Sequence, residues 1–383
     1  MPRVLVLMSE TGGGHRASAE ALQAAFAERY GPALQVQIVD PWSDHTPWPI
    51  HHLPRIYGPM VHYTPWLWKA LWILGERNWI ARPVLALMGL LTQRSLLRLY
   101  QAQAPDLVIC VHPLVQHPAL RALRRYDPRV PFLTVVTDLA SVSATWFHAG
   151  VTCCLVPSVE AREKALALGL GPDQVALVGL PVRPAFARPL PDKARLRAER
   201  GLAPDRDTVL LMGGGEGVGP LAAIATALAE RLSRDGRSAQ MVVICGRNRR
   251  LRRRLLERAW PLPVHVLGFV EEMPGWMAAA DVIVTKAGPG TIAEALICGL
   301  PLVLFSYIPG QEEGNVAYVT AQGVGVYLPE PEEVAAQVSH WLGPGRAQRE
   351  AMAARARALG RPQATFQIVE QAANLLSSIP VSP

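Results

Sequence analysis

This 383-residue chain has few lysines, no CxxC cysteine pair and no long apolar run. The five cysteines include no CxxC motif, and an odd number makes a poor disulfide framework, so a reducing cytoplasm is expected. No apolar run reaches the roughly 20 residues needed to cross a bilayer. The stretch before the first glycine turn is too short for a signal peptide. Any contact with a membrane is therefore expected to be peripheral.

The positive charge of the chain is almost all arginine, because only four of its 38 basic residues are lysines. A net charge of +7 suits nucleic acid, an anionic membrane or a phosphorylated substrate. The run 247–258 predicts a basic helix. Nucleic-acid binding would interleave aromatic side chains with this charge, and the run has none. We therefore expect no nucleic-acid partner, and either a solvated face or a contact with anionic membrane lipids.

The alternation of strands and helices predicts two α/β domains, each with a parallel sheet covered on both faces. In the first half the expected strands are 3–8, 34–39, 106–111, 132–136 and 151–156, and the expected helices are 15–29, 93–103 and 160–168. In the second half the expected strands are 208–212, 241–245, 264–267, 281–285 and 301–305, and the expected helices are 220–234, 290–298 and 363–377.

Composition sets the expected domain boundaries. We expect an N-terminal Rossmann-like domain over 1–182, a proline-rich hinge over 183–206, and a C-terminal Rossmann-like domain over 207–362. The last segment, 363–383, is expected to pack its helix back on the N-terminal domain.

An aromatic insertion follows the second expected strand. Residues 41–91 hold six of the ten tryptophans, among them Trp66, Trp68 and Trp72. Indole rings favour the headgroup region of a bilayer, so these residues favour amphipathic pieces that enter one leaflet. The alternative is an aromatic core beneath a long insertion.

The first glycine-rich turn, 9–16, runs from a strand into a helix. It places Gly13, Gly14 and His15 on the mouth side of the sheet, where α/β proteins bind ligands. The turn has neither P-loop nor GxGxxG spacing. We interpret it as a ligand site; the alternative is a tight turn with an exposed histidine.

The second glycine-rich turn, 212–219, occupies the equivalent place in the second half and contains Gly214 and Gly215. Two such turns, one in each half, indicate two sites that face a common cleft. The alternative is a pair of purely structural turns.

A third motif, 285–294, indicates a diphosphate site. Gly288, Pro289 and Gly290 precede a helix whose N-terminus offers backbone donors to an anion. Lys286 adds a positive charge and Thr291 a hydroxyl donor, while Glu294 lies one turn along, where its carboxylate can bind both ribose hydroxyls; Glu294 as a capping-type residue is the alternative. The following loop, 307–315, supplies the polar groups that sugar hydroxyls need, from Gln311, Glu312 and Asn315, unless it is a plain surface loop.

Two further polar residues end strands of the first half. His112 closes one strand, and Asp138 closes another, where it would orient His15 or contact the acceptor, or else only cap a turn. His112 and His117 are five residues apart, but no third ligand has suitable spacing, so no metal site is expected.

With these motifs in view, the chain resembles the monogalactosyldiacylglycerol synthases of plants and photosynthetic bacteria. It is more distantly similar to the processive diacylglycerol glucosyltransferases and to the peptidoglycan N-acetylglucosaminyltransferase that makes lipid II. The resemblance runs from Thr11 to about residue 330 and is carried by Thr11–His15, His112–Leu114, Val135–Leu139, Thr145–His148, Gly179–Pro184, Leu211–Gly217, Val243–Asn248, Lys286–Ala295 and Pro309–Gln311.

The resemblance implies an inverting GT-B glycosyltransferase, with an interdomain cleft and no cofactor or metal requirement. A UDP-sugar, UDP-galactose or UDP-glucose, would be the donor and diacylglycerol the acceptor. His15 matches the proposed catalytic base, and Asp138 is its expected partner. The expected donor-binding residues are Arg183, Gly214, Gly215, Phe269, Val270, Met273, Lys286, Gly288, Pro289, Gly290, Thr291, Glu294, Gln311, Glu312 and Asn315. The expected acceptor and membrane residues are Gly13, Gly14, His112, Trp66, Trp68 and Trp72.

Three alternatives to galactose transfer stay open at this stage. UDP-glucose would serve the same chemistry; galactose is favoured by the resemblance only. A soluble UDP-sugar epimerase on the same fold would not need the tryptophan insertion, and a non-catalytic nucleotide-sugar sensor at the membrane would not need His15, Glu294 and Gln311 together. The plant proteins carry an N-terminal transit extension that this sequence does not show, so we expect a cytoplasmic enzyme on the inner face of the plasma membrane.

Overall fold

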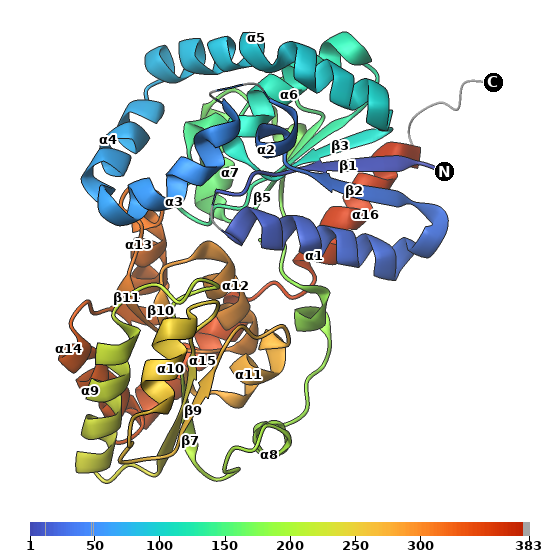
Figure 1. Cartoon of the computed structure of the whole chain (residues 1–383). Helices are drawn as coiled ribbons and strands as arrows, with labels where there is room; N and C mark the ends of the chain where they lie inside the picture. The colour runs from blue at the N-terminus through green and yellow to red at the C-terminus, as the bar shows by residue number, and fades with distance from the viewer. Residues whose placement is uncertain (12, 47, 49, 378–383) are drawn as a thin grey trace. The chain divides into compact units, whose positions relative to one another are not determined.

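The computed structural model describes residues 1–377 except 12, 47 and 49, and its chain divides into two compact units. The first unit comprises Met1–Pro184, Ile308–Gln311 and Pro362–Pro383, and the second comprises Ala185–Tyr307 and Glu312–Arg361. Each unit contains one six-stranded sheet in which all pairs are parallel (Figure 1). The predicted α/β class with two parallel sheets is confirmed.

The sheet of the first unit has the strand order β2-β1-β3-β4-β5-β6. Its strands are β1 (Arg3–Leu7), β2 (Gln35–Val39), β3 (Leu107–Cys110), β4 (Phe132–Val135), β5 (Cys153–Val156) and β6 (Val175–Leu177). Side chains alternate across this sheet, as the two-residue period of a strand requires. Val4 and Val6 therefore join the core on one face, and Leu5 and Leu7 join the core on the other.

Helices cover both faces of the first sheet. The helices of this unit are α1 (Gly13–Tyr30), α2 (Pro41–His45), α3 (Leu53–Tyr63), α4 (Pro65–Gly75), α5 (Asn78–Gln103), α6 (Pro113–Tyr126), α7 (Val159–Ala167) and α16 (Ala364–Ser377), of which α3 and α4 pack on other helices and not on the sheet. The C-terminal helix α16 lies beside α1, and its Ile368 and Val369 are buried in the core with Val4 and Val6 (Figure 1).

The aromatic insertion is helical, where the sequence pattern left it unassigned. It forms α2, α3, α4 and the first half of α5, so the helix expected over 93–103 begins 15 residues earlier, at Asn78. Prolines obscured this pattern. Pro54 and Pro65 occupy the first turns of α3 and α4, where a missing N–H costs no hydrogen bond, so they start helices rather than break them.

The second unit repeats the architecture with the order β12-β11-β10-β7-β8-β9. Its strands are β7 (Asp207–Met212), β8 (Ala239–Ile244), β9 (Val264–Leu267), β10 (Val282–Lys286), β11 (Leu302–Ser306) and β12 (Gly325–Tyr327). Its helices are α8 (Lys193–Glu199), α9 (Leu221–Arg234), α10 (Arg249–Leu256), α11 (Met273–Ala279), α12 (Pro289–Cys298), α13 (Glu313–Ala321), α14 (Pro331–Trp341) and α15 (Arg346–Leu359).

Each strand order contains a point where the chain reverses its direction of winding. In the first unit β1 has β2 on one side and β3 on the other, so the loops after β1 and β3 diverge. In the second unit β7 lies between β8 and β10 in the same way. Ligands of open α/β sheets bind at such switch points, outside the carboxyl ends of the strands. The two glycine-rich turns follow β1 and β7 and therefore start at these points.

Candidate functional site

His15 lies at the switch point of the first unit, in the first turn of α1, and its side chain is buried. Its Nδ1 is 2.8 Å from the hydroxyl of Thr137, which follows β4. That hydroxyl donates to the carbonyl of Val111, after β3, at 3.3 Å. A hydroxyl has one proton, and when that proton goes to Val111 the Thr137 oxygen accepts from His15 Nδ1–H. The lone pair of His15 is then on Nε2, the atom that can take a proton from a substrate.

Burial changes the acidity expected of His15. Desolvation lowers the pKa of His15 to about 4, and the nearby carbonyl of Val111 opposes this only in part. The ordinary pKa of an imidazole, near 6.5, therefore does not apply to His15. At neutral pH the imidazole carries no charge and is able to accept a proton.

His112 is the neighbour of His15 at this switch point. Its ring is 4.6 Å from that of His15, edge to face. His112 Nε2 lies 2.7 Å from the hydroxyl of Thr11 in the first glycine-rich turn. Burial and the second imidazole hold the pKa of His112 well below its usual range. In the described part of the chain, His112 Nδ1 and the hydroxyl of Ser9 are buried without a hydrogen-bond partner, which suits them to a polar ligand.

Asp138 is connected to this cluster through a tryptophan. The indole N–H of Trp146 donates to Asp138 Oδ2 at 2.6 Å, and the Trp146 ring lies 6.2 Å from that of His15. The polar side chain on His15 Nδ1 is Thr137, which the sequence analysis missed although it stands next to Asp138. A contact between Asp138 and the acceptor stays a prediction. Gly13 and Gly14 begin α1 with open space where a Cβ would stand, and Gly12 lies outside the described residues.

Some tryptophans of the insertion fit an aromatic core, and others fit a surface that enters a membrane leaflet. Trp42 is fully buried and belongs to the core of the first unit. Trp68 and Trp72 are half-buried, with their rings 6.1 Å apart. Trp66 and Trp79 are 71% and 72% exposed. One part of the segment is thus an aromatic core and another part is an exposed apolar surface.

That exposed surface extends along three helices of the first unit. We call it the apolar face, and its members are Leu53, Ile56, Tyr63, Trp66, Leu67, Leu71, Ile73, Leu74, Trp79, Val84, Leu87, Leu90 and Leu91 from α3, α4 and α5. An exposed apolar surface of this extent indicates an interaction site. Within the described residues, no helix is both long and apolar enough to span a bilayer.

The switch point of the second unit holds the diphosphate motif. Lys286 ends β10, and its Nζ donates to Glu312 Oε1 at 2.6 Å. A Cβ on Gly214 would lie 3.5 Å from the Lys286 side chain, which places the second glycine-rich turn beside this ion pair. Asn315 is buried and donates from Nδ2 to the carbonyl of Ala287 at 2.9 Å. These residues, all predicted from sequence except Ala287, lie together.

The N-terminus of α12 opens at the same place. Gly288 is its N-cap and Pro289 its first residue, so the backbone N–H groups of Gly290 and Thr291 lie in the first turn, where no carbonyl of the helix can accept from them. Such groups and the helix dipole attract an anion. Glu294 is half-buried in the next turn.

The other predicted donor residues divide between the units. Phe269 is 53% exposed and follows β9, Val270 is half-buried, and Met273 is buried at the start of α11. Arg183 and Gln311 belong to the first unit, where the hydroxyl of Tyr57 donates to Gln311 Oε1 at 2.8 Å. A common cleft that brings Arg183 and Gln311 to the second unit's residues stays a prediction.

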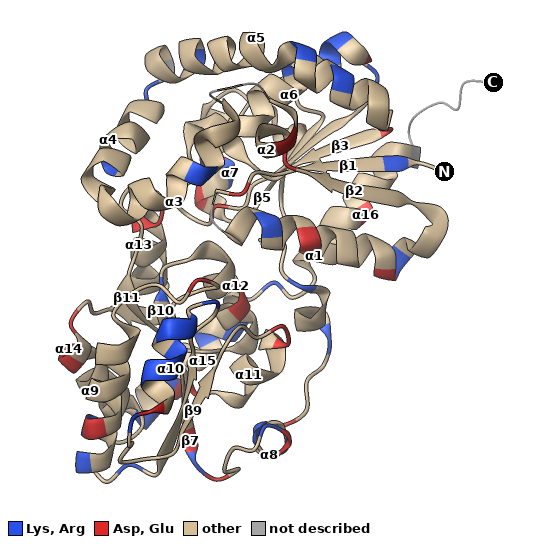
Figure 2. Cartoon of the chain, in the orientation of Figure 1, with Lys and Arg blue, Asp and Glu red and all other residues tan. Residues whose placement is uncertain are grey.

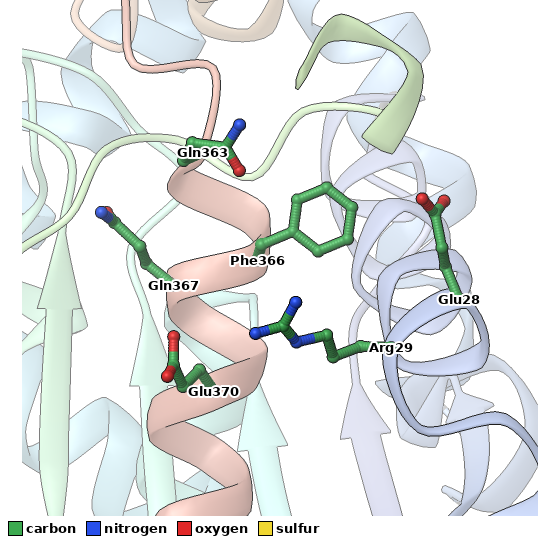
Figure 3. Close-up of a pocket in the computed structure, with 6 residues that line it drawn as sticks. All are labelled: Glu28, Arg29, Gln363, Phe366, Gln367 and Glu370. Carbon is green, nitrogen blue, oxygen red and sulfur yellow. The ribbon is translucent and has the colours of Figure 1, made fainter. Parts of the chain in front are cut away.

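A hollow of about 330 Å³ lies elsewhere, between α1 and α16 (Figure 3). It is lined by Glu28, Arg29, Gln363, Phe366, Gln367 and Glu370. Glu28 is 13 residues along α1 from His15, about 20 Å at the helical rise per residue. The hollow is therefore separate from the switch point of the first unit. Among the described residues, no group of three histidine, cysteine, aspartate or glutamate side chains is placed to hold a metal ion.

Known proteins match the chain along nearly its whole length. The family model for monogalactosyldiacylglycerol (MGDG) synthase matches residues 15–182, and that for the glycosyltransferase family 28 C-terminal domain matches 208–370. The chloroplastic monogalactosyldiacylglycerol synthase of Spinacia oleracea is 47% identical over 96% of this chain and 71% of its own length. Monogalactosyldiacylglycerol synthase 1 of Arabidopsis thaliana is 45% identical over 96% of this chain and 70% of its own.

The chain belongs to the monogalactosyldiacylglycerol synthase family. The fold of this family member is GT-B. The crystal structure of Acinetobacter baumannii MurG covers 98% of this chain and 100% of its own with a TM-score of 0.66, although only 18% of residues are identical. The family resemblance drawn from the sequence motifs is confirmed.

The expected location of this synthase-family member needs correction. The spinach and Arabidopsis relatives are chloroplastic proteins. The expectation of a cytoplasmic enzyme on the inner face of the plasma membrane is therefore wrong. That expectation came from the cysteine count and from where the sequence starts, neither of which distinguishes one compartment with free thiols from another. All five cysteines are free in this structure.

Proposed function

We propose that this protein transfers galactose from UDP-galactose to the free hydroxyl of 1,2-diacylglycerol, forming monogalactosyldiacylglycerol with inversion at the anomeric carbon. Membership of the synthase family is the observation that carries this proposal. The two switch points supply the chemistry, with a neutral imidazole in the first unit and an anion-binding helix N-terminus in the second.

His15 acts as the general base in this proposal. As the acceptor oxygen attacks the anomeric carbon, its proton passes to His15 Nε2, and the bond from that carbon to the diphosphate breaks with its electrons leaving on UDP. A pKa of about 4 makes the free imidazole a weak base. The proton therefore moves together with formation of the glycosidic bond rather than before it, and Thr137 keeps Nε2 as the accepting atom.

The leaving diphosphate is stabilised by the start of α12. The N–H groups of Gly290 and Thr291 and the helix dipole favour an anion there, by about 0.3–1 kcal/mol per charge at an exposed site and up to about 2 kcal/mol when partly buried. Lys286 adds a full charge, but Glu312 already neutralises it. The donor must therefore compete with Glu312 for Lys286, or bind both residues through its phosphate and sugar. The proposal needs no metal or other cofactor, because these groups supply the positive charge.

The acceptor reaches the protein from a lipid surface in this proposal. The apolar face of α3, α4 and α5 presents Trp66 and Trp79, which suit the headgroup region of a bilayer. Anionic membrane lipids are the proposed partners of the arginines that gather on α10 in the second unit (Figure 2). The apolar face distinguishes this proposal from a soluble epimerase, which would not need it.

The identity of the transferred sugar is the most specific part of the proposal. Gln311, Glu312 and Asn315 are the residues proposed to contact sugar hydroxyls, and galactose differs from glucose only in the orientation of the hydroxyl at C4. The choice of galactose over glucose rests on membership of the synthase family.

Incubation of the purified protein with diacylglycerol vesicles and an equimolar mixture of UDP-galactose and UDP-glucose tests the donor. The galactolipid is the expected main product. A predominant glucolipid would replace galactose with glucose, and UDP release without any glycolipid would overturn the transferase proposal itself.

A further inference from the structure

Two residues of the glycine-rich motifs have no role in the mechanism above. Glu216 belongs to the second glycine-rich turn, and Arg247 follows β8 in the motif Val243–Asn248. They are 31 positions apart and lie in direct contact, with Arg247 Nη1 donating to Glu216 Oε1 at 2.8 Å. Both side chains are largely exposed, Arg247 at 59% and Glu216 at 64%.

The backbones of the second glycine-rich turn and of the loop after β8 are in close contact. A Cβ on Gly217 would lie 2.1 Å from the carbonyl oxygen of Cys245, and one on Gly246 would lie 2.2 Å from that of Gly215. Both glycines have positive φ, at 59° and 56°, so only glycine fits either position without strain. The N–H of Arg247 donates to the same Gly215 carbonyl at 2.8 Å. The position of Arg247 is therefore fixed by main-chain contacts rather than by its side chain.

From this fixed position Arg247 reaches Phe269, one of the predicted donor-binding residues. Its guanidinium carbon lies 4.6 Å from the centre of the Phe269 ring, within the range of a cation–π contact. A Cβ on Gly215 would be 3.7 Å from Arg247 Nη1 and 3.8 Å from Phe269 Cε2, so both side chains converge on the second glycine-rich turn. Phe269 nevertheless keeps 53% of its surface exposed, so the ring is not shielded from a ligand.

We propose that Arg247 is a positioning residue for the nucleotide donor. Glu216 holds its guanidinium over one face of Phe269, and this fixes the ring so that its remaining surface forms a wall against the base of the donor. The proposal rests on the proposed function, because the UDP-sugar donor assigns Phe269 to the base. It adds the loop after β8 to the loops after β7 and β9 on the side of the donor site that would contact the base.

The chemistry of arginine explains why this residue type is needed. A guanidinium is planar, stacks on aromatic rings and donates to a carboxylate in a fixed geometry, whereas the ammonium of lysine has no plane to stack. An isolated exposed ion pair would contribute little, about 0.2–1 kcal/mol. Arg247 instead combines the ion pair with the ring contact and the main-chain anchor, at the carboxyl edge of the sheet.

Nucleotide titration of the purified full-length protein tests this role. UMP and UDP share the base but differ in phosphate charge. Arg247→Ala should raise the Kd of both by the same factor, about threefold to tenfold for the loss of a cation–π contact that orders a binding wall. Arg247→Lys should restore less than half of the affinity that Arg247→Ala loses. Glu216→Ala should also raise both Kd values, by a smaller factor than Arg247→Ala. Arg234→Ala removes an equally exposed charge at the end of α9 and should leave both values unchanged.

Four results would overturn the proposal. Wild-type Kd values for Arg247→Ala would remove Arg247 from donor binding while leaving the proposed function intact. Weaker binding of UDP with unchanged binding of UMP would assign Arg247 to the diphosphate instead of the base. An equal loss in Arg234→Ala would reduce the effect to overall charge. A wild-type protein that binds neither nucleotide would contradict the proposed function itself, and this inference with it.

Discussion

The imidazole rings of His15 and His112 lie edge to face with their centres 4.6 Å apart, at the carboxyl ends of β1 and β3. They come from loops about a hundred residues apart, which meet because the first sheet reverses its winding between these two strands. Two cations at this separation in a buried site would repel strongly. The pair is therefore neutral at physiological pH, which leaves His15 able to accept a proton.

The acidic limb of the pH–rate profile should report this burial. The base must be neutral, and the pKa of His15 is about 4. The value of kcat/KM should therefore stay level as the pH falls from 7 to about 5, and then decline as His15 becomes protonated. Initial rates after brief exposure to each pH, followed by a return assay at pH 7, separate titration from unfolding. A reversible decline centred between pH 6 and 7 would show an unburied histidine and contradict the structure.

Thr137 should affect the reaction rate only through its contact with His15. Thr137→Val keeps the shape of the side chain but removes the hydroxyl that contacts Nδ1, so the imidazole loses its fixed tautomer. A kcat lower by about 10- to 100-fold is expected, less than the 10²–10⁴-fold contribution of the positioned base itself, with little change in the donor KM. Thr137→Ser keeps the hydroxyl and should retain most of the activity. Equal losses in the serine and valine variants would mean that the methyl group, not the hydroxyl, is needed.

Lys286 and Glu312 should show coupled effects. Lys286→Met leaves the buried carboxylate of Glu312 without its ion-pair partner and should destabilise the protein by roughly 1–3 kcal/mol, less than for a fully buried pair because Lys286 is one-quarter exposed. Adding Glu312→Gln should restore much of this stability, as measured by thermal denaturation. The double variant should still bind UDP-galactose more weakly than the wild type. A donor KM at the wild-type value in the double variant would remove Lys286 from the diphosphate site.

The apolar face should govern binding to vesicles. Trp66 and Trp79 are more than 70% exposed, so changing both to serine should leave the melting temperature nearly unchanged. Sedimentation with diacylglycerol-containing vesicles should fall at least fivefold, because each indole loses its place among the headgroups. Val159→Ser changes an apolar residue of similar exposure at the start of α7 and serves as the control. Unchanged sedimentation of the double variant would assign the membrane contact to another surface.

The sequence predicted the strands and the residues at their carboxyl ends more fully than the helices between them. Buried strands are short runs of branched apolar residues, and β1, β3 and β10 follow that pattern directly. Helix α6 was not predicted, and it contains two prolines, Pro113 at its first position and Pro118 inside it. Prolines at helix starts concealed α3 and α4 in the same way.

The residues of each site were predicted separately, but their contacts were not. Thr137 carries no signal of its own in the sequence, since only the fold brings the loop after β4 to the start of α1. The low pKa of His15 likewise follows from burial among side chains from distant segments. The ion pair between Lys286 and Glu312 depends on adjacent strand ends. Sequence motifs indicate which groups are available, and the sheet order decides which of them meet.

The direct test of the account is the rate of galactolipid formation by His15→Ala, measured beside the wild type with saturating UDP-galactose and diacylglycerol vesicles. We expect a kcat lower by about 10²–10⁴-fold, the contribution of a general base, with an unchanged UDP Kd. Turnover within a few-fold of the wild type would contradict the assignment of His15 as the base and the mechanism built on it.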